Sequence, residues 1–214
     1  MTDQARQTAQ AIAEALLTAK AFTLRPDQPF VWASGWLSPI YCDNRLTLSL
    51  PQVRTLVKEG LVELIQRQFP QVACIAGVAT AGIPQATLVA DALQLPLLYV
   101  RPSPKDHGRG NQVEGRITPG AQVVVIEDLI STGGSSLRAC EALKREGAMV
   151  AGMVSIFTYG FKTAYEAFNH AGLSIFSLTD YDTLLAVALE QGQFAPAHLE
   201  SLRQWRQAPE QWGI

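Results

Sequence analysis

The sequence has few cysteines, little net charge and no long apolar run. Its three cysteines, Cys42, Cys74 and Cys140, are widely spaced, with no Cys-x-x-Cys pair and no histidine nearby at zinc-ligand spacing. This usage suits a reducing compartment, so the cytoplasm is the default expectation. The N-terminus lacks a charged segment leading into an apolar stretch, and no apolar run approaches the ~20 residues that span a bilayer. We therefore expect neither a secretory signal nor a membrane anchor.

The net charge of the chain is −2 at pH 7, and its pI is near 5.9. No overall basic field would draw it to nucleic acid or to an anionic membrane, so a site for an anionic substrate must create positive potential locally. Hydrophobic residues make up 48% of the chain and charged residues 17%, which predicts a sizeable buried core. We expect residues 1–214 to form a single α/β domain with a small appendage.

The most informative segment, residues 123–135, passes from an apolar run through two carboxylates into a loop of hydroxyl residues and glycines. The continuous β-branched run predicts a parallel strand buried on both faces. Glu127 and Asp128 would fall at the carboxyl end of this strand, where open α/β sheets place their ligands. Two adjacent carboxylates there can accept hydrogen bonds from a pair of vicinal ribose hydroxyls.

The loop that follows offers donors for an anion. Its glycines let the backbone approach a phosphate, and hydroxyl and backbone N–H groups from Ser131 to Ser135 can converge on it. A helix predicted over about 135–146 would direct the positive end of its dipole to the same phosphate. This interaction would stabilise the bound phosphate by roughly 0.3–1 kcal/mol. The alternative is a tight turn at Thr132-Gly133-Gly134 beside solvated strand-end charges. Neither a Walker loop nor a Gly-x-Gly-x-x-Gly sequence follows the strand.

From Val72 onward, short apolar runs alternate with helical patterns, which predicts βαβ units and a parallel sheet. The predicted strands lie near 72–78, 96–101, 122–127, 149–157 and 174–177. The predicted helices lie near 4–20, from Pro51, near 83–93, 135–146, 162–171 and 181–190, and within 194–214. Residues 22–50 contain several aromatic residues together with Pro26 and Pro29. They are expected to form strands and loops that cover another part of the domain. Residues 102–120 are predicted to be a charged lid between two buried strands, or else a solvated charged loop.

Residues 123–135 resemble the phosphoribosyl pyrophosphate (PRPP) motif of the type I phosphoribosyltransferases. Residues 30–45, with their Ser-Gly-x-x-Ser-Pro-x-Tyr core, are similar to the N-terminal signature of the orotate phosphoribosyltransferases. Residues 101–108 resemble the mobile catalytic loop of that family. Residues 77–84 resemble the loop that presents backbone amides to pyrophosphate, although a plain strand-to-helix turn explains glycine there equally well. Four motifs in the expected order are far more specific than one.

The resemblance implies an α/β fold of the type I phosphoribosyltransferase kind, with a central, mainly parallel sheet flanked by helices and a small N-terminal hood over about 22–50. It implies transfer of the phosphoribosyl group from PRPP to orotate, giving orotidine 5′-monophosphate and pyrophosphate in pyrimidine biosynthesis. Magnesium (Mg²⁺) would be held mainly by PRPP and water, with no dedicated protein ligands. The family also implies a homodimer in which the catalytic loop, about 102–120, reaches the neighbouring subunit's site.

The resemblance assigns roles to individual residues. The implied catalytic residues are Arg101, Lys105, His107 and Asp128, of which the three cations, with Arg109 nearby, would stabilise the departing pyrophosphate. The implied PRPP-binding residues are Arg101, Lys105, His107, Glu127, Asp128, Leu129, Ile130, Ser131, Thr132, Gly133, Gly134 and Ser135. The implied orotate-binding residues are Ser131, Tyr41 and Cys42, the last two through their backbone groups.

The chain departs from the family pattern at Pro102, Ala33 and Ala81, where many members carry lysine. These replacements are compatible with three interpretations: the chain belongs to a subgroup of the family, it binds orotate more weakly, or it uses a different base as substrate. The side chains of Phe30, Trp32 and Trp36 are expected to form a buried aromatic cluster, and His170 and His198 are expected at the surface.

Two other functions compete with orotate transfer. A purine phosphoribosyltransferase would build its hood from different sequence than residues 30–45. A PRPP-sensing regulator of the same fold would be expected to carry a basic patch or a helix-turn-helix, and neither is apparent.

Overall fold

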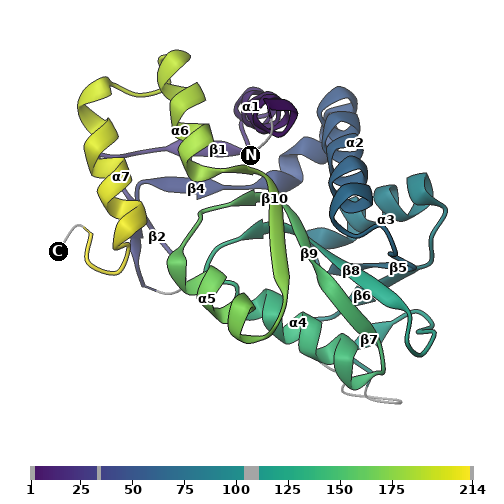
Figure 1. Cartoon of the computed structure of the whole chain (residues 1–214). Coiled ribbons are helices and arrows are strands. Elements are labelled where there is room, and N and C mark those ends of the chain that lie inside the picture. Colours follow the sequence, from purple (N-terminus) through teal and green to yellow (C-terminus); the bar gives the residue numbers. More distant parts are fainter. Residues whose placement is uncertain (1–2, 33–34, 104–110, 213–214) are drawn as a thin grey trace.

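The computed structural model describes residues 3–32, 35–103 and 111–212. Within them, six strands form a central sheet in the order β10-β9-β8-β5-β6-β7 (Figure 1). The strands are β5 (Cys74–Val78), β6 (Leu97–Val100), β7 (Val113–Glu114), β8 (Gln122–Ile130), β9 (Met149–Thr158) and β10 (Ser174–Asp180). Only the pair β6 and β7 is antiparallel. The predicted α/β fold with a mainly parallel sheet is confirmed.

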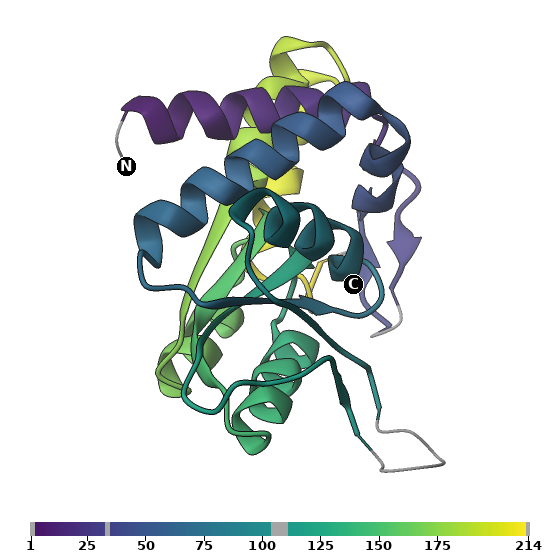
Figure 2. The same ribbon diagram turned by 90° about the vertical axis from the view of Figure 1, so that its right-hand side faces the viewer.

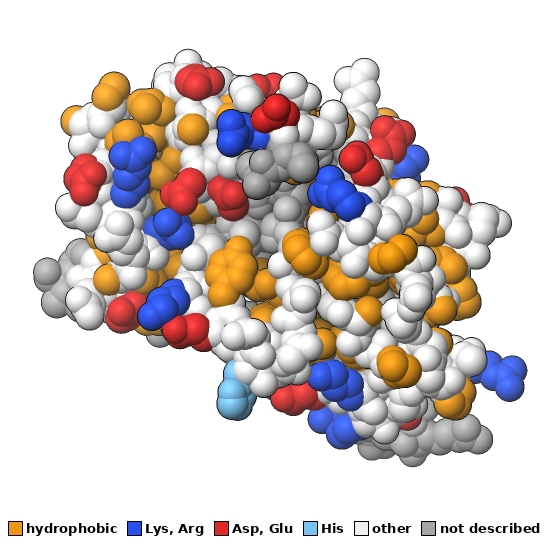
Figure 3. Space-filling model, viewed as in Figure 1, with side chains coloured by type: hydrophobic (Ala, Val, Ile, Leu, Met, Phe, Trp, Pro, Cys, Tyr) orange, Lys and Arg blue, Asp and Glu red, His pale blue; other side chains and the backbone are white. Residues whose placement is uncertain are grey.

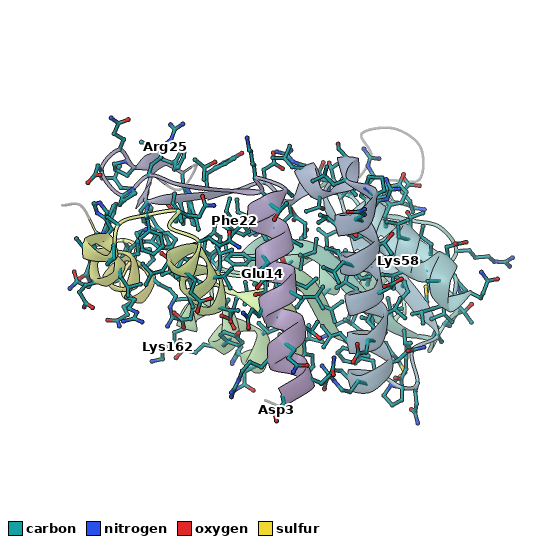
Figure 4. All side chains as sticks on the ribbon, turned by 90° about the horizontal axis from the view of Figure 1, so that it is seen from above. Asp3, Glu14, Phe22, Arg25, Lys58 and Lys162 are labelled. Atoms are coloured by element: carbon teal, nitrogen blue, oxygen red, sulfur yellow. The ribbon has the colours of Figure 1, made fainter. Side chains whose placement is uncertain are left out.

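Helices cover both faces of this sheet (Figures 1 and 2). On one face lie α1 (Asp3–Thr18), α2 (Pro51–Gln68), α3 (Gly82–Leu93) and α6 (Tyr181–Glu190). On the other face lie α4 (Gly134–Arg145) and α5 (Lys162–His170). Figure 4 shows α1 running beside α2, with Asp3 at one end and Phe22 just beyond the other. No helix in the described part of the chain is long and apolar enough to cross a membrane.

The central strand β8 explains why its sequence is continuously apolar. Val124 and Ile126 pack into the core under α1, α2 and α3, whereas Val123 and Val125 pack into the core over α4. All four side chains are fully buried. Because side chains alternate between the two faces and both faces are covered, every position must be apolar. Burial of each such side chain contributes roughly 1.5–3 kcal/mol to the stability of the folded protein.

The described residues of the segment 22–50 form the predicted mixture of short strands and loops, and we call this segment the hood. In it, β1 (Phe22–Leu24) pairs antiparallel with β4 (Ile40–Cys42), and β2 (Phe30–Val31) pairs antiparallel with β3 (Leu37–Ser38). A 3₁₀ helix, η1 (Asn44–Ser49), leads into α2.

The C-terminal segment, with η2 (Pro196–His198) and α7 (Leu199–Gln207), supports the hood. The indole of Trp205 in α7 donates a hydrogen bond to the Leu37 carbonyl at 2.9 Å. The hood is thereby attached to the last helix of the chain.

Three sequence-based boundaries are wrong. The strand predicted over 174–177 continues to Asp180, where it still pairs with β9. The strand predicted to end at residue 127 continues to Ile130, because β9 is long enough to pair with it as far as Thr158. Glu127 and Asp128 therefore lie inside β8 and not after it. The segment 102–120 is also not entirely a loop, since β7 forms within it and pairs with Tyr99 and Val100 of β6.

Candidate active site

Glu127 and Asp128 interact closely near the carboxyl end of β8. Glu127 is 8% exposed, and its Oε2 accepts a hydrogen bond from Ser136 Oγ of α4 at 3.4 Å. Its Oε1 accepts the Asp128 backbone N–H at 3.3 Å. Burial, with the Asp128 charge in addition, raises the pKa of Glu127 to about 9. Burial also raises the pKa of Asp128. The pair therefore retains a proton more readily than two isolated carboxylates would, and it is suited to bind hydroxyl donors or a cation.

The turn from β8 into α4 has the geometry of an anion cradle. Gly133 adopts φ 80°, and a Cβ atom there would lie 2.9 Å from Phe168 Cε2, so the position requires glycine. Helix α4 begins at Gly134, and no side chain caps its N-terminus. The N–H groups of its first turn are thus not capped by a side chain and could bind an anion. The binding of a phosphate by residues 131–135 stays a prediction.

The turn from β5 into α3 approaches β8 closely. A Cβ atom on Gly82 would lie 2.5 Å from the Ile126 carbonyl oxygen. Packing against β8 is therefore sufficient to require glycine at this position. A role of the loop containing Gly77 and Gly82 in binding pyrophosphate stays a prediction.

A cavity of about 540 Å³ opens between the hood and the ends of β8 and β9. The hood residues that line it are Phe30, Val31, Trp32, Trp36, Tyr41 and Cys42. The residues from the sheet side are Leu129, Ser131, Thr132 and Tyr159. The structure thus brings together the three residues predicted to bind orotate. The prediction for Phe30, Trp32 and Trp36 is only partly correct, because these side chains are half-buried and line a cavity.

A slightly larger cavity, about 580 Å³, runs along the edge strand β10 between α1, α2 and α5. It contains none of the predicted site residues. Size alone therefore does not identify the functional site, and the carboxylates and the cradle lie by the cavity under the hood.

The hood is joined to the carboxylate pair by Asn44, which is 1% exposed. Its Nδ2 donates a hydrogen bond to the Asp128 backbone carbonyl at 2.9 Å, and its Oδ1 accepts one from the Cys42 thiol at 3.4 Å. Next to it, the Arg45 guanidinium donates two hydrogen bonds to the Asp43 carboxylate, at 2.6 and 2.9 Å. The sequence analysis missed Asn44, although it directly precedes Arg45 at the end of the N-terminal signature.

Tyr159 and Ser136 were also missed. Ser136 is the next residue after the PRPP motif, so extending the motif by one position would have included it. Tyr159 directly follows β9, the strand next to β8. The rule that ligands bind beyond the carboxyl ends of parallel strands could have indicated it.

Of the cations predicted to bind pyrophosphate, Arg101 lies among the described residues, directly before the predicted lid. Arg101 follows β6, and its guanidinium lies 3.8 Å from the Glu114 carboxylate of β7. Lys105, His107 and Arg109 lie outside the described residues, as does Ala33 of the hood. His170 is exposed, whereas His198 is half-buried and lies 3.6 Å from Asp27, so the surface prediction is fully met only at His170.

The donor set fits a magnesium ion that the substrate carries. Among the described residues, no cluster of three or more His, Cys, Asp or Glu side chains could hold a metal ion. Glu127 and Asp128 offer hard oxygen donors, and Mg²⁺ in nucleotide and phosphate sites takes one or two carboxylates together with phosphate oxygens and water.

Comparison with known proteins gives consistent matches. The model of the phosphoribosyl transferase domain family matches residues 49–170. An orotate phosphoribosyltransferase of Bacillus subtilis is 58% identical over 201 residues, covering 94% of this chain and 93% of the relative. One of Cytophaga hutchinsonii is 53% identical over 201 residues, covering 94% and 96%. The crystal structure of orotate phosphoribosyltransferase from Aeropyrum pernix superposes with a TM-score of 0.75 at 30% identity, covering 86% of this chain and 99% of that one.

Proposed function

The chain belongs to the orotate phosphoribosyltransferase family, and we propose that its reaction takes place where β8 meets the hood. The enzyme transfers the 5-phosphoribosyl group of PRPP to orotate, forming orotidine 5′-monophosphate and pyrophosphate in pyrimidine biosynthesis. The observation that carries the location is the arrangement along the end of β8. Leu129, Ser131 and Thr132 line the cavity together with Tyr41 and Cys42, and they lie between the Glu127–Asp128 pair and the uncapped start of α4. Ser136 of α4 in turn donates a hydrogen bond to Glu127.

In the proposed mechanism, the carboxylates of Glu127 and Asp128 accept hydrogen bonds from the ribose hydroxyls. Breaking the bond from ribose C1 to pyrophosphate leaves positive charge on the sugar, and nearby carboxylates stabilise that charge by position alone. Residues Ser131, Thr132, Gly133, Gly134 and Ser135 bind the 5-phosphate through hydroxyl and backbone N–H groups. Leu129 and Ile130 contribute to PRPP binding as the connecting backbone.

Orotate occupies the cavity under the hood, so that its ring nitrogen N1 faces ribose C1. Ser131 and the backbone of Tyr41 and Cys42 bind it, and the aromatic lining keeps water out. The purine alternative is not favoured, because the relatives in the comparison are orotate enzymes. The alternative of a nucleic-acid-binding regulator is not favoured either. Acidic and basic side chains are interspersed on the face seen in Figure 3, whereas such a regulator would be expected to carry a basic patch.

The pyrophosphate end of the reaction depends on the lid. We propose that Arg101, Lys105 and His107 bind the departing pyrophosphate, and that the lid closes over the site of the neighbouring subunit in a homodimer. Mg²⁺, when bound, neutralises the charge of the pyrophosphate oxygens.

The three free cysteines support a cytoplasmic location, and we propose that residues 1–214 act as one domain.

The deciding experiment is an ultraviolet assay of the purified protein with PRPP and Mg²⁺, in which orotate, uracil, hypoxanthine, guanine and adenine are offered separately. We expect consumption of orotate that requires both PRPP and Mg²⁺. The Asp128→Asn variant should remain folded by circular dichroism and lose at least about 10²-fold in kcat. Consumption of another base would reassign the cavity, and an active Asp128→Asn variant would contradict the role of the carboxylates.

A further inference from the structure

Tyr159 is a buried residue of the cavity under the hood for which the preceding mechanism has no role. It is 2% exposed, and its backbone N–H donates to the Ile130 carbonyl at 3.1 Å, which anchors it at the end of β8. Its ring lies 5.2 Å from that of Trp32 and 5.5 Å from that of Phe161, measured between centroids. The aromatic neighbours hold the ring in place beside the cavity.

The hydroxyl group of Tyr159 has no hydrogen-bond partner among the described residues. The contrast is Tyr181, a neighbour in the same aromatic cluster. Tyr181 is 1% exposed, and its hydroxyl donates to the Leu202 carbonyl at 3.0 Å. Among the described residues, the fully enclosed side-chain polar atoms without a partner are Gln85 Oε1 and Thr179 Oγ1. The Tyr159 hydroxyl is therefore not fully enclosed, and it can be reached from the cavity that Tyr159 lines. An acceptor on a ligand would complete the hydrogen bonding of Tyr159.

The ionisable groups around the phenol bear on its protonation state. Cys42, Asp128 and Tyr41 are among the ionisable groups that act electrostatically on it, and Cys42 and Tyr41 line the cavity. Burial is the main reason that the pKa of Tyr159 is well above its usual value. The phenol is therefore protonated at neutral pH and serves as a hydrogen-bond donor.

The described residues that line the cavity include no lysine, arginine or histidine. Among the described lining residues, only neutral donors are therefore available to a negatively charged group of a ligand in this cavity. The hydroxyls available for this are those of Ser131, Thr132 and Tyr159, with Tyr41 at the more exposed rim.

We propose that Tyr159 donates a hydrogen bond to the carboxylate of orotate and so selects a 6-carboxypyrimidine over uracil. The carboxylate is attached next to N1, the atom that bonds to ribose C1, so it lies on the ribose side of the base. Asp128, which we assign to the ribose, acts on the same phenol. The inference rests on the proposed function, since it concerns how that site recognises its base.

The test is the Tyr159→Phe variant, which keeps the ring and removes only the hydroxyl. We expect KM for orotate to rise by about tenfold to a hundredfold, the loss typical of a hydrogen bond to a charged acceptor, with kcat reduced less than about threefold. The inhibition constant of uracil, which lacks the carboxylate, should change by less than about twofold. The melting temperature should not fall, because the deleted hydroxyl has no partner among the described residues.

Tyr181→Phe is the matched control, because it removes a paired hydroxyl from the same cluster. It should lower the melting temperature and leave KM for orotate unchanged. An unchanged KM in Tyr159→Phe, or equal weakening of orotate and uracil, would overturn the inference while the wild-type enzyme still consumes orotate. Failure of the wild-type enzyme to consume orotate would instead contradict the proposed function.

Discussion

At residue 127 a carboxyl group is buried beside a second carboxyl group, and this arrangement makes stability depend on pH. The folded-state pKa of Glu127, about 9, is above its ordinary value of 4.5. The folded protein therefore binds a proton that the unfolded chain releases. The contribution of this proton to the free energy of unfolding is fully present below about pH 4.5. It is lost as pH rises towards about 9, and the free energy of unfolding then falls by at most about 1.4 kcal/mol per pH unit.

We predict that Glu127→Gln is more stable than the wild type at pH 8, and that this advantage shrinks towards pH 5. The amide cannot ionise, so the variant does not lose stability as pH rises through this range. Urea unfolding at several pH values measures the difference. The control is Glu141→Gln, which removes an exposed carboxylate from α4. A constant difference between Glu127→Gln and the wild type across this range would contradict the raised pKa. The variant should also lose activity, because the amide cannot ionise when positive charge develops on the ribose.

At the scale of elements, the two helices that follow β5 and β8 begin with glycine for different reasons. A Cβ atom on Gly82 would lie 2.5 Å from a backbone oxygen of β8, whereas one on Gly134 would meet only Arg138 Nη1 at 3.6 Å. We predict that Gly82→Ala lowers the free energy of unfolding by about 1–3 kcal/mol, since backbone atoms cannot move aside cheaply.

Gly134→Ala is the matched control at the first residue of α4, and its effect on stability should stay within about 1 kcal/mol. Denaturant unfolding of the two variants in parallel checks the comparison. Equal effects would mean that α3 can move away from β8 without cost.

Another element-level link joins η1 to β8 through the hydrogen bond from Asn44 to the Asp128 carbonyl. We predict that Asn44→Ala lowers kcat by about tenfold, corresponding to the loss of one buried hydrogen bond that positions Asp128. KM for PRPP should change less than kcat. Steady-state kinetics separates the two effects.

Thr47→Val provides the control, because Thr47 Oγ1 donates to the Asn44 carbonyl at 2.6 Å within η1, whereas the hydrogen bond from η1 to β8 among the described residues comes from Asn44. It should lower stability but leave kcat within about threefold of the wild-type value. If both variants reduce kcat equally, the integrity of η1 matters and not the bond to Asp128.

At the scale of the whole molecule, the proposed homodimer makes a prediction about complementation. Lys105→Ala and Asp128→Asn should each be nearly inactive alone, since one lacks a lid cation and the other a carboxylate. Mixed dimers should recover part of the activity if the lid acts on the neighbouring subunit, because one of the two sites then has both intact groups. Sedimentation confirms the dimer, and an assay after unfolding and refolding the mixture measures recovery. Absence of recovery in verified mixed dimers would show that each lid serves its own subunit.

The sequence by itself determined the order of elements from β5 to α6 except for β7, the buried character of β8, and the carboxylate and glycine motif. These features are local, because each depends on neighbouring residues: an apolar run, a helical period or a turn that needs glycine. Sequence similarity to a known family further indicated the reaction, which the comparisons support at 58% identity.

Only the tertiary structure decided which distant residues meet in the site. The strand containing Glu127 continues to Ile130 because β9 pairs with it, and no local pattern reports the length of a partner strand. Asn44 reaches Asp128 across 84 residues of sequence, and Tyr159 enters the cavity from the neighbouring strand. These contacts depend on how separate segments pack, because hydrogen bonds and cavities form between surfaces that are brought together only when the whole chain has folded.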